Sequence, residues 1–332
     1  MQEDTVTLLC SANAAYAAPL AVMLTSAARN LKSAARLSIH VVESDISQQL
    51  RERIELSVQG NKADKLEVIF NWKRIDLDRF GYEPGLASGR YFLPRDCFSR
   101  LLAAEILPPS CTRAIYLDSD IVVLGDIGKL QSLINDESTI SAATGVYWPY
   151  ISSEHTPGRA VVFNYAELGL NERRPYFNSG VMVLNMNRWR ERDIGAKALA
   201  YLEMHQDKIH LHDQGILNAI LANEWFRLDQ KWNQCSTILD PSIWKEPEYN
   251  RIQWKNTFLS SHIIHFDGPS KPWLSTARQP RMSYYYKYLK LTDFNKNVRE
   301  PFLSRMEAVL GVTLYYRLWD IYRSVKSRLR RA

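Results

Sequence analysis

Strongly apolar segments alternate with segments of helical spacing over the first 125 residues of the chain. The apolar segments fit buried strands at 5–12, 37–44, 65–72 and 113–125. The segments between them have the apolar spacing of helices, at 19–35, 46–59 and 96–107. We expect Ser44 or Asp45 to cap the second helix. Strand–helix alternation of this kind predicts an α/β fold in which helices cover both faces of a parallel sheet.

The composition is typical of a globular chain that can bury a sizeable core. Of its 332 residues 46% are hydrophobic, and Gly and Pro are both modest at 14 each. The cysteines lack the paired spacing of a zinc site or a disulfide scaffold, so we expect free thiols at Cys10, Cys97, Cys111 and Cys235. The start MQEDTVTLLC lacks the basic region of a signal peptide, and no apolar run is long enough for a transmembrane helix. These features favour a cytoplasmic protein.

The positive charge of the chain is concentrated at its C-terminus. Residues 312–332 carry six Lys or Arg against one acid, which accounts for +5 of the net charge of +6. The rest of the chain is close to neutral, which argues against a broad surface for nucleic acid. Apolar residues of this tail share one helical stripe: Leu314, Leu318, Ile321, Val325 and Leu329. A basic amphipathic helix is typical of binding to an anionic membrane surface, although a helix docked on the protein has the same pattern.

The stretch YLDSDIVV places two carboxylates, Asp118 and Asp120, at the end of the fourth predicted strand. Ligands of such sheets bind beyond the carboxyl ends of the strands, so the pair can point into a crevice rather than into the core. Two carboxylates this close repel one another unless a cation lies between them. Mg²⁺ and Mn²⁺ suit such oxygen ligands and leave positions for phosphate oxygens. Acids that merely cap the junction of a strand and a turn would give the same short pattern.

Two later segments carry polar side chains that can bind a sugar. FNSGV opens an apolar strand with Asn178, whose amide can reach a sugar hydroxyl or simply shape a turn. HDQGILN starts an apolar helix with Asp213 and Gln214, and Asp213 taken alone fits an N-cap.

A third segment, HFDGPSKPW, adds groups that suit a metal and a phosphate. His265 ends a predicted strand and, together with Asp118 and Asp120, makes a candidate three-residue metal shell. Gly268 lets the backbone approach a ligand closely, and Lys271 can reach a phosphate group.

YLDSD, FNSGV, HDQGILN and HFDGPSKPW occur together in the order and at the separations of one family. The sequence resembles the family 8 retaining glycosyltransferases, of the bacterial lipopolysaccharide galactosyltransferase and glucosyltransferase type. The similarity extends from the first strand to about Trp273. It implies a GT-A fold (Rossmann-like, nucleotide-diphospho-sugar transferase) and a metal-dependent hexosyltransferase of the EC 2.4.1 type. The donor would be UDP-galactose or UDP-glucose, with Mn²⁺ or Mg²⁺, and the acceptor a glycan or a lipid-linked saccharide such as the lipopolysaccharide core.

The resemblance also implies roles for particular side chains. Asp118 and Asp120 correspond to the metal-binding pair, and His265 to the third protein ligand. Positions that correspond to donor-binding residues of the family are Ser11, Ala12, Asn13, Tyr16, Arg100, Asp118, Ser119, Asn178, Ser179, Asp213, Gln214, Gly268 and Lys271.

The resemblance places Gln214 and Asp213 at the reacting sugar as the catalytic residues. A neutral amide is a poor nucleophile compared with a carboxylate, so we favour attack of the acceptor on the same face as the leaving group over double displacement. Gln214 would then stabilise an oxocarbenium-like transition state, and the phosphate of UDP would take the acceptor proton.

The nucleotide end of the site departs from the family pattern. Asn13 stands where family members usually carry the Asp that accepts the uracil N–H, and an amide oxygen can still accept that hydrogen bond. Ala14 and Ala15 replace polar residues, which removes any ribose contact from the Ala15 side chain.

Other interpretations stay open beside the resemblance. Haloacid-dehalogenase-like phosphatases also end a strand in Asp-x-Asp, and there Asp118 would be the nucleophile and Asp120 the acid–base. Their motif usually lies on the first strand, whereas three predicted strands precede it here. A non-catalytic UDP-sugar-binding membrane protein is a second alternative. A self-glucosylating enzyme is a third, with an acceptor among residues 284–286 or the tail tyrosines Tyr315, Tyr316 and Tyr322, although aromatic packing explains these tyrosines better.

We expect two parts in the chain. A GT-A catalytic domain would span 1–285, and a helical, basic, membrane-associating segment would span 286–332. This arrangement predicts a cytoplasmic enzyme that lies peripherally on the inner leaflet of the cell membrane.

Overall fold

The computed structural model describes most of the chain outside its C-terminal end. The described residues are 4–75, 95–146, 149–152, 160–205, 208–235, 257–275, 277, 279–296, 298–311, 313–315, 317, 318 and 321.

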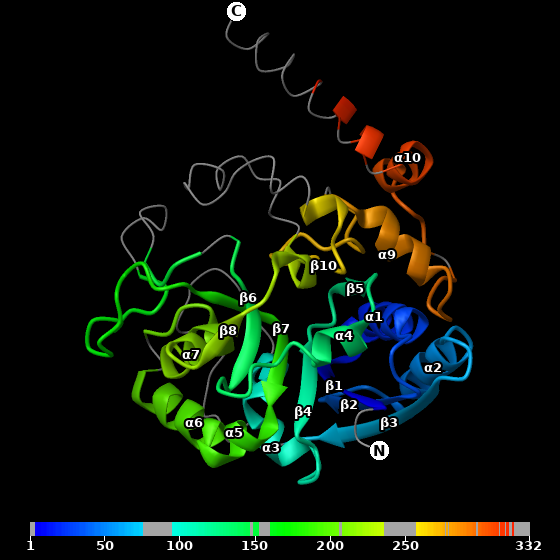
Figure 1. Cartoon of the computed structure of the whole chain (residues 1–332). Helices are drawn as coiled ribbons and strands as arrows, with labels where there is room; N and C mark the ends of the chain where they lie inside the picture. Colours follow the sequence, from blue (N-terminus) through cyan, green and yellow to red (C-terminus); the bar gives the residue numbers. More distant parts are fainter. Residues whose placement is uncertain are drawn as a thin grey trace, which may run out of the picture.

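A seven-stranded sheet forms the centre of the molecule, in the order β3-β2-β1-β4-β7-β6-β8 (Figure 1). Its strands are β1 (Thr5–Ala12), β2 (Arg36–Glu43), β3 (Glu67–Arg74), β4 (Arg113–Leu117), β6 (Ile140–Thr144), β7 (Phe177–Asn185) and β8 (Trp225–Arg227). The first four of these pair in parallel, as the strand–helix alternation predicts. The sheet is nevertheless mixed, because β7 runs antiparallel to both β4 and β6. The expectation of a purely parallel sheet is therefore corrected, while the α/β class is confirmed.

Helices cover both faces of this sheet. They are α1 (Ala17–Asn30), α2 (Gln48–Gln59), α3 (Ala103–Ile106), α4 (Ile127–Gln131), α5 (Met186–Glu191), α6 (Ile194–His205) and α7 (His212–Ile220). Successive residues of a strand point to opposite faces. Accordingly Leu8 of β1 packs in a core with α1, α2 and α4, and Leu9 packs in a second core with α3, α5, α6 and α7.

Two of the early helices differ in detail from the sequence predictions. Ser47 caps α2 by accepting a hydrogen bond from the Leu50 N–H at 3.3 Å, so neither Ser44 nor Asp45 is the cap. Asp45 instead accepts a hydrogen bond from the backbone of Ala14 at 2.5 Å. The helix predicted over 96–107 begins as a 3₁₀ helix, η3 (Arg95–Leu102), and continues as α3.

The fourth predicted strand, over 113–125, is two strands in different sheets. After β4 the chain turns and forms β5 (Ile121–Val123), which belongs to a small sheet with the order β5-β10-β9. The partners are β9 (Gln234–Cys235) and β10 (Ile263–His265), and the 3₁₀ helix η4 (Gln230–Trp232) precedes β9. The turn between β4 and β5 carries both acids of the YLDSD motif.

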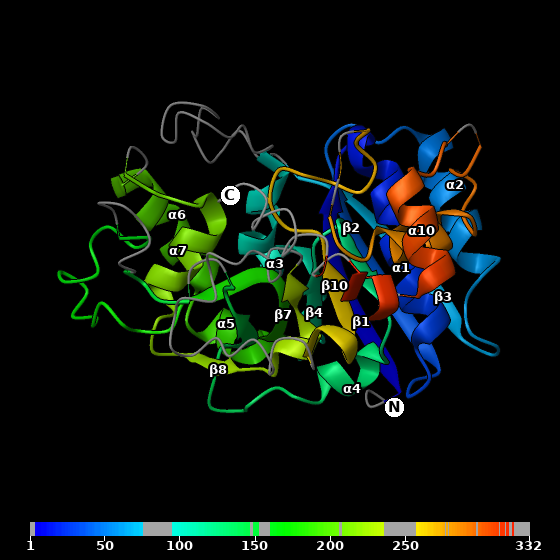
Figure 2. The same cartoon turned by 90° about the horizontal axis from the view of Figure 1, so that it is seen from above.

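The chain after β10 packs back on the first helix. The helix α9 (Met282–Leu289) contacts α1, and α10 (Phe302–Leu310) contacts α9 (Figures 1 and 2). Tyr285 and Tyr286 are buried there among other aromatic side chains, which agrees with the packing explanation of the tyrosine cluster. The expected domain boundary at residue 285 lies inside α9 and stays a prediction.

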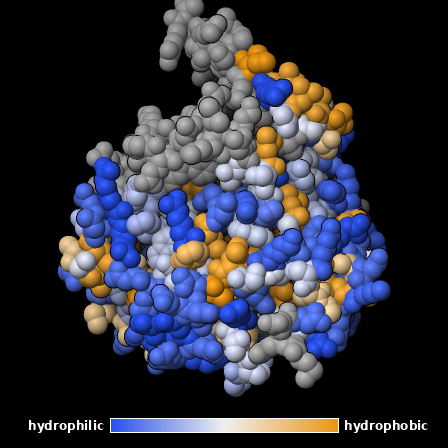
Figure 3. All heavy atoms as spheres, viewed as in Figure 1, coloured by the Kyte–Doolittle hydropathy of each residue, from blue (hydrophilic) through white to orange (hydrophobic). Residues whose placement is uncertain are grey.

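Apolar side chains are exposed at the C-terminal end of the described chain. Figure 3 shows them over and beyond α10, and the described ones are Phe302, Val309, Leu314, Leu318 and Ile321. Two of the five residues of the predicted amphipathic stripe, Val325 and Leu329, lie outside the described residues, and so does Trp319. Among the described residues, no helix is long and apolar enough to cross a membrane.

Candidate active site

Two carboxylates and one imidazole meet beyond the end of β4. Asp118 and Asp120 lie in the turn between β4 and β5, and His265 ends β10. The Nε2 atom of His265 is 3.3 Å from Oδ1 of Asp120 and 3.8 Å from Oδ2 of Asp118. One ligand atom from each residue lies within 4.8 Å of the other two. The structure therefore brings together the three residues that the sequence predicts as metal ligands.

Backbone pairing fixes the three residues. The N–H of Asp118 donates to the Gly180 carbonyl of β7 at 2.9 Å, and the carbonyl of Asp120 accepts from the Phe266 N–H at 3.0 Å. Within the small sheet His265 pairs with Ile121 of β5. The turn is thus held from both sides, by the antiparallel strand β7 and by β10.

The cluster fits a divalent cation. The Oδ1 atom of Asp120 is buried and accepts no hydrogen bond, which leaves it available as a ligand atom. A Cβ atom at Gly180 would lie 2.3 Å from Cε1 of His265 and 2.7 Å from Oδ2 of Asp118, so glycine keeps the space around these groups free. Two carboxylates and one imidazole are a donor set that Mn²⁺ and Mg²⁺ accept, with Mn²⁺ the better match to nitrogen.

Lys271 neutralises the buried acid of this cluster. Its ammonium group forms an ion pair with Asp120 and donates to the Phe266 carbonyl at 2.8 Å. Burial works against the charged form of Asp120, yet Lys271 and His265 hold the pKa of this carboxyl well below its usual range. Burial would likewise lower the pKa of His265, but Asp120 raises it above the ordinary value. Asp120 is therefore ionised at neutral pH and able to bind a cation.

Arg100, from η3, joins the metal cluster to the acid of α7. Its guanidinium contacts Asp118 at 2.8 Å and Asp213 at 3.0 Å, and only 5% of the side chain is exposed. It also donates to the carbonyl and hydroxyl oxygens of Ser179 at 2.8 and 3.0 Å, and it stacks over the Tyr116 ring at 4.3 Å. Burial lowers the pKa of Arg100, but the two acids more than compensate and raise it. A permanent positive charge thus lies between two carboxylates.

Asp213 is not the N-cap of α7. The helix begins at His212, and the cap is Leu211 in the left-handed conformation, with φ of 60°. The Asp213 side chain instead faces Arg100, and its Oδ2 accepts from the Ser179 hydroxyl at 3.3 Å. Burial raises the pKa of Asp213, although Arg100 opposes the shift. Its contacts fit a role in holding Arg100 rather than in ending a helix.

Gln214 and Asn178 face the same edge of the sheet. The Oε1 atom of Gln214 accepts from the Ser179 N–H at 3.0 Å, and its Nε2 donates to the Tyr176 hydroxyl at 3.3 Å. The Oδ1 atom of Asn178 accepts from the Gly180 N–H at 3.0 Å. Both amides are partly exposed and oriented by the first residues of β7.

The residues predicted to bind the nucleotide gather at the end of β1. Ser119 donates its hydroxyl to the Ser11 carbonyl at 2.7 Å, which connects this strand to the metal turn. Ala12 ends β1, and η1 (Ala14–Tyr16) follows. The ring of Tyr16 packs edge-on against Trp273 with centroids 5.6 Å apart.

Asn13 already uses both ends of its amide within the protein. Its Oδ1 caps η1 by accepting from the Tyr16 N–H at 3.2 Å, and its Nδ2 donates to Asp96 at 3.2 Å. The second oxygen of Asp96 is buried without a hydrogen bond. Ala15 is exposed. The position predicted to bind the base therefore lies beside an acid, Asp96, which the sequence analysis treated only as part of a helix.

Gly268 lies in the loop that follows β10. Its φ of +77° is favourable only for glycine, and nothing lies within 4 Å of the position where a Cβ would be. The space beside the backbone is open here, which the predicted ligand contact at Gly268 requires.

Sequence reasoning missed Asn233 and Tyr116. Tyr116 donates its hydroxyl to Asp118 at 3.0 Å, and it reads in the sequence as one more apolar strand residue. Asn233 is fully buried beside His265, with its Oδ1 3.0 Å from Nδ1 of the imidazole. The segment KWNQC that contains it has no strong periodicity, so only its contacts show that it belongs to the site.

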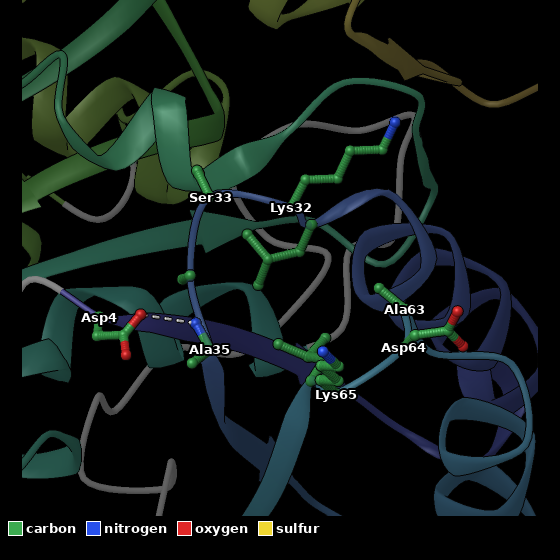
Figure 4. Close-up of a pocket in the computed structure, with 10 residues that line it drawn as sticks. Asp4, Lys32, Ser33, Ala35, Ala63, Asp64 and Lys65 are labelled. Atoms are coloured by element: carbon green, nitrogen blue, oxygen red, sulfur yellow. Dashed lines mark hydrogen bonds between the residues drawn. The ribbon is translucent and has the colours of Figure 1, made fainter.

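One cavity among the described residues lies elsewhere. It has a volume of about 500 Å³ and is bordered by the start of β1, the segment after α1 and the segment before β3 (Figure 4). Figure 4 labels seven of the residues that line it, which are Asp4, Lys32, Ser33, Ala35, Ala63, Asp64 and Lys65. This is the amino end of the parallel strands, opposite to the edge where ligands of such sheets bind. The cavity is therefore not the site of the predicted chemistry.

Comparison with known proteins identifies the family. The sequence profile of glycosyl transferase family 8 matches residues 7–277. The chain belongs to this family. The match extends over the two acids, both later motifs and His265, so it favours a glycosyltransferase over the phosphatase interpretation of YLDSD.

Several known proteins are similar over much of the chain. General stress protein A of Bacillus subtilis is 27% identical over 89% of this chain and 97% of its own length. The lipopolysaccharide 1,3-galactosyltransferase of Salmonella typhimurium is 29% identical over 75% of this chain and 67% of its own length. The lipopolysaccharide 1,2-glucosyltransferase of Escherichia coli is 28% identical over 58% of this chain, which spans 53% of that relative.

Solved structures confirm the GT-A fold. The galactosyltransferase LgtC, in complex with donor and acceptor sugar analogues, superposes with a TM-score of 0.68 over 91% of this chain and 100% of its own. Sequence identity to it is 18%, so this likeness speaks for the fold alone. The family 8 chain is thus a glycosyltransferase with its candidate metal cluster at the carboxyl edge of the sheet.

Replacing Gly180 by alanine should impair metal binding. The new methyl group would displace His265 and Asp118, and ligand distances tolerate only small changes. We expect Gly180→Ala to weaken Mn²⁺ binding by about tenfold or more, measured by the electron paramagnetic resonance signal of free Mn²⁺. Gly195→Ala is the matched control, because its methyl group would only approach the Leu101 carbonyl at 3.3 Å. Equal Mn²⁺ affinity in both variants would contradict this account of Gly180.

Proposed function

We propose that this family 8 glycosyltransferase is a retaining, metal-dependent hexosyltransferase that moves galactose or glucose from a UDP-sugar to a saccharide acceptor. The observation that carries the proposal is the cluster of Asp118, Asp120 and His265, whose ligand atoms lie within 4.8 Å of one another. Lipopolysaccharide hexosyltransferases among its relatives support the donor class and suggest a lipopolysaccharide core or another lipid-linked glycan as acceptor.

A divalent ion held by this cluster would neutralise the diphosphate of the donor and make UDP a better leaving group. Lys271 lies at the same place, paired with Asp120. Once a cation compensates Asp120, Lys271 is free to turn toward a phosphate oxygen. Gly268 presents open backbone in the same loop. The two residues together form the expected diphosphate contacts.

The donor sugar would lie between Asn178 and Gln214, next to the metal cluster. The hydrogen bond from Gly180 fixes the Oδ1 atom of Asn178, which leaves its Nδ2 for a sugar hydroxyl. Arg100 is held by Asp118 and Asp213, so it can reach a hydroxyl without losing its counter-charges. Ser179 places these groups, because it contacts both Arg100 and Gln214.

Gln214 suits electrostatic stabilisation better than nucleophilic attack. Its amide is neutral, and its Oε1 is held by the Ser179 N–H. The carbonyl dipole can stabilise the positive charge that develops on the sugar ring, without forming a bond to it. Asp213, the nearest carboxylate along the chain, is occupied by Arg100 and only 4% exposed. The geometry therefore favours attack by the acceptor on the same face, with the proton passing to the phosphate of UDP.

Replacing Gln214 by alanine tests this role. We expect kcat to fall about 10–100-fold with little change in the donor KM, because the lost interaction strengthens in the transition state. Gln214→Glu, which keeps the size of the side chain, serves as the companion variant. A covalent sugar adduct on Gln214 in the mass spectrum of the wild-type enzyme, quenched during turnover, would instead establish double displacement.

Metal removal tests the proposed function directly. We expect one UDP-sugar of a panel to release UDP in the presence of Mn²⁺, and EDTA to abolish the release. Asp120→Ala should lower turnover by about 100-fold or more, since a metal at the leaving group contributes several kcal/mol. Glu191→Ala, an exposed residue remote from the cluster, is the control and should keep full activity. Binding of UDP without any turnover, even with a membrane extract as acceptor, would instead identify a binding protein.

We also propose that the C-terminal segment 286–332 holds the enzyme on the inner leaflet of the cell membrane. The exposed apolar residues at and after α10, together with six basic residues in 312–332, support this localisation. Deletion of 312–332 should abolish sedimentation with vesicles that contain phosphatidylglycerol. The full chain should bind pure phosphatidylcholine vesicles much more weakly, because the contribution of the basic residues requires anionic lipid. Sedimentation of the truncated protein with the anionic vesicles would exclude the tail as the anchor.

A further inference from the structure

Asn233 lies behind the metal cluster and contacts two functional residues at once. It follows η4 and precedes β9, and its side chain is fully buried. Its Oδ1 is 3.0 Å from Nδ1 of His265, and its Nδ2 is 2.8 Å from Oδ1 of Asn178. The parallel pairing of β9 with β10, in which Cys235 lies opposite His265, holds Asn233 at this place.

The orientation of these amides follows from one backbone group. The Gly180 N–H can only donate, so the Asn178 atom at 3.0 Å from it must be the oxygen. That oxygen also faces the amide of Asn233, so the Asn233 atom at this contact must be the nitrogen. The remaining atom of the amide, the Oδ1 of Asn233, then faces His265.

This sequence of hydrogen bonds determines the tautomer of the imidazole. Because the Asn233 oxygen accepts, Nδ1 of His265 must carry the hydrogen. The lone pair of a neutral imidazole is then on Nε2, the atom that faces Asp118 and Asp120. The thiol of Cys235 adds a weak contact to the same oxygen, at 3.8 Å. Metal-binding histidines are commonly oriented in this way by a partner on the other ring nitrogen.

We propose that Asn233 is a positioning residue, which holds His265 in the tautomer that binds the metal and connects it to the sugar-binding amide of Asn178. The proposal rests on the metal site of the proposed function. It gives Asn233 a role through two other side chains, since its own atoms are buried away from any ligand.

Two substitutions separate this role from simple packing. Asn233→Ala removes the acceptor and leaves Nδ1 of His265 without its partner. Asn233→Asp keeps an acceptor for Nδ1 but turns an oxygen toward the oxygen of Asn178. If Asn233 only filled the core, Asn233→Asp would damage the fold and its metal site more than Asn233→Ala, because the aspartate buries a charge. If it orients His265, the aspartate should preserve metal binding better than the alanine.

The experiment measures binding of Mn²⁺ to the full-length, EDTA-treated chain through the paramagnetic resonance signal of the free ion. Compared with the wild type, we expect Asn233→Ala to bind about 10–100-fold more weakly and Asn233→Asp to remain within about threefold. The thermal unfolding midpoint of each metal-free variant reports the packing effect separately. If Asn233→Ala does not fold, the Mn²⁺ affinity of Asn233→Asp alone tests whether Asn233 orients His265.

Unchanged Mn²⁺ affinity in Asn233→Ala would overturn the proposal, and so would an affinity of Asn233→Asp as low as that of Asp120→Ala. Either result would leave the proposed metal site intact. A wild-type chain that binds no Mn²⁺ would overturn the metal site and the role of Asn233 together. The wild-type measurement therefore separates failure of the proposed function from failure of this inference.

Discussion

The mutual repulsion of Asp118 and Asp120 is the constraint on which the rest of the site depends. Two carboxylates separated by one residue are stable at a partly buried position only if positive groups compensate each of them. Arg100 contacts the first acid and Lys271 the second, and each of these bases comes from a different part of the chain. His265 approaches both acids with a nitrogen that a metal can share. The fold has to bring these distant groups to a single turn.

The antiparallel strand β7 is the element that completes this arrangement. If it ran parallel to β4, its first residues would lie at the amino end of the sheet, far from the two acids. Because β7 runs antiparallel, it begins beside Asp118. There the Gly180 carbonyl accepts a hydrogen bond from the Asp118 N–H, and the Ser179 carbonyl accepts one from Arg100. The same few residues also orient Asn178 and Gln214. The start of one strand thus sets the geometry of both the proposed metal site and the proposed sugar site.

Local patterns in the sequence predicted the early strands and helices, because the spacing of apolar residues along a short segment distinguishes a buried strand from an amphipathic helix. The same holds for the acids and for His265, which follow apolar runs. Strand direction is different, since the antiparallel course of β7 depends on pairing between residues far apart in sequence. Asp213 shows a further limit of prediction from local sequence. An acid at a helix start predicts a cap, and only the position of Arg100 turns it into an ion pair. Asn233 is part of no sequence motif, and only the contacts of its buried amide with Asn178 and His265 show that it belongs to the site.

The charges of the site also explain why a neutral amide suits the position of Gln214. Arg100 and Lys271 are the permanent cations in contact with Asp118, Asp120 and Asp213. A carboxylate in place of Gln214 would add repulsion to these acids, and its burial would raise its pKa, as burial does for Asp213. An amide offers the oxygen of a carboxylate without its charge. Its orientation then has to come from hydrogen bonds, and Ser179 and Tyr176 provide them. On the proposed mechanism, the enzyme thus stabilises a positive sugar with a fixed dipole and keeps its carboxylates for the metal and for Arg100.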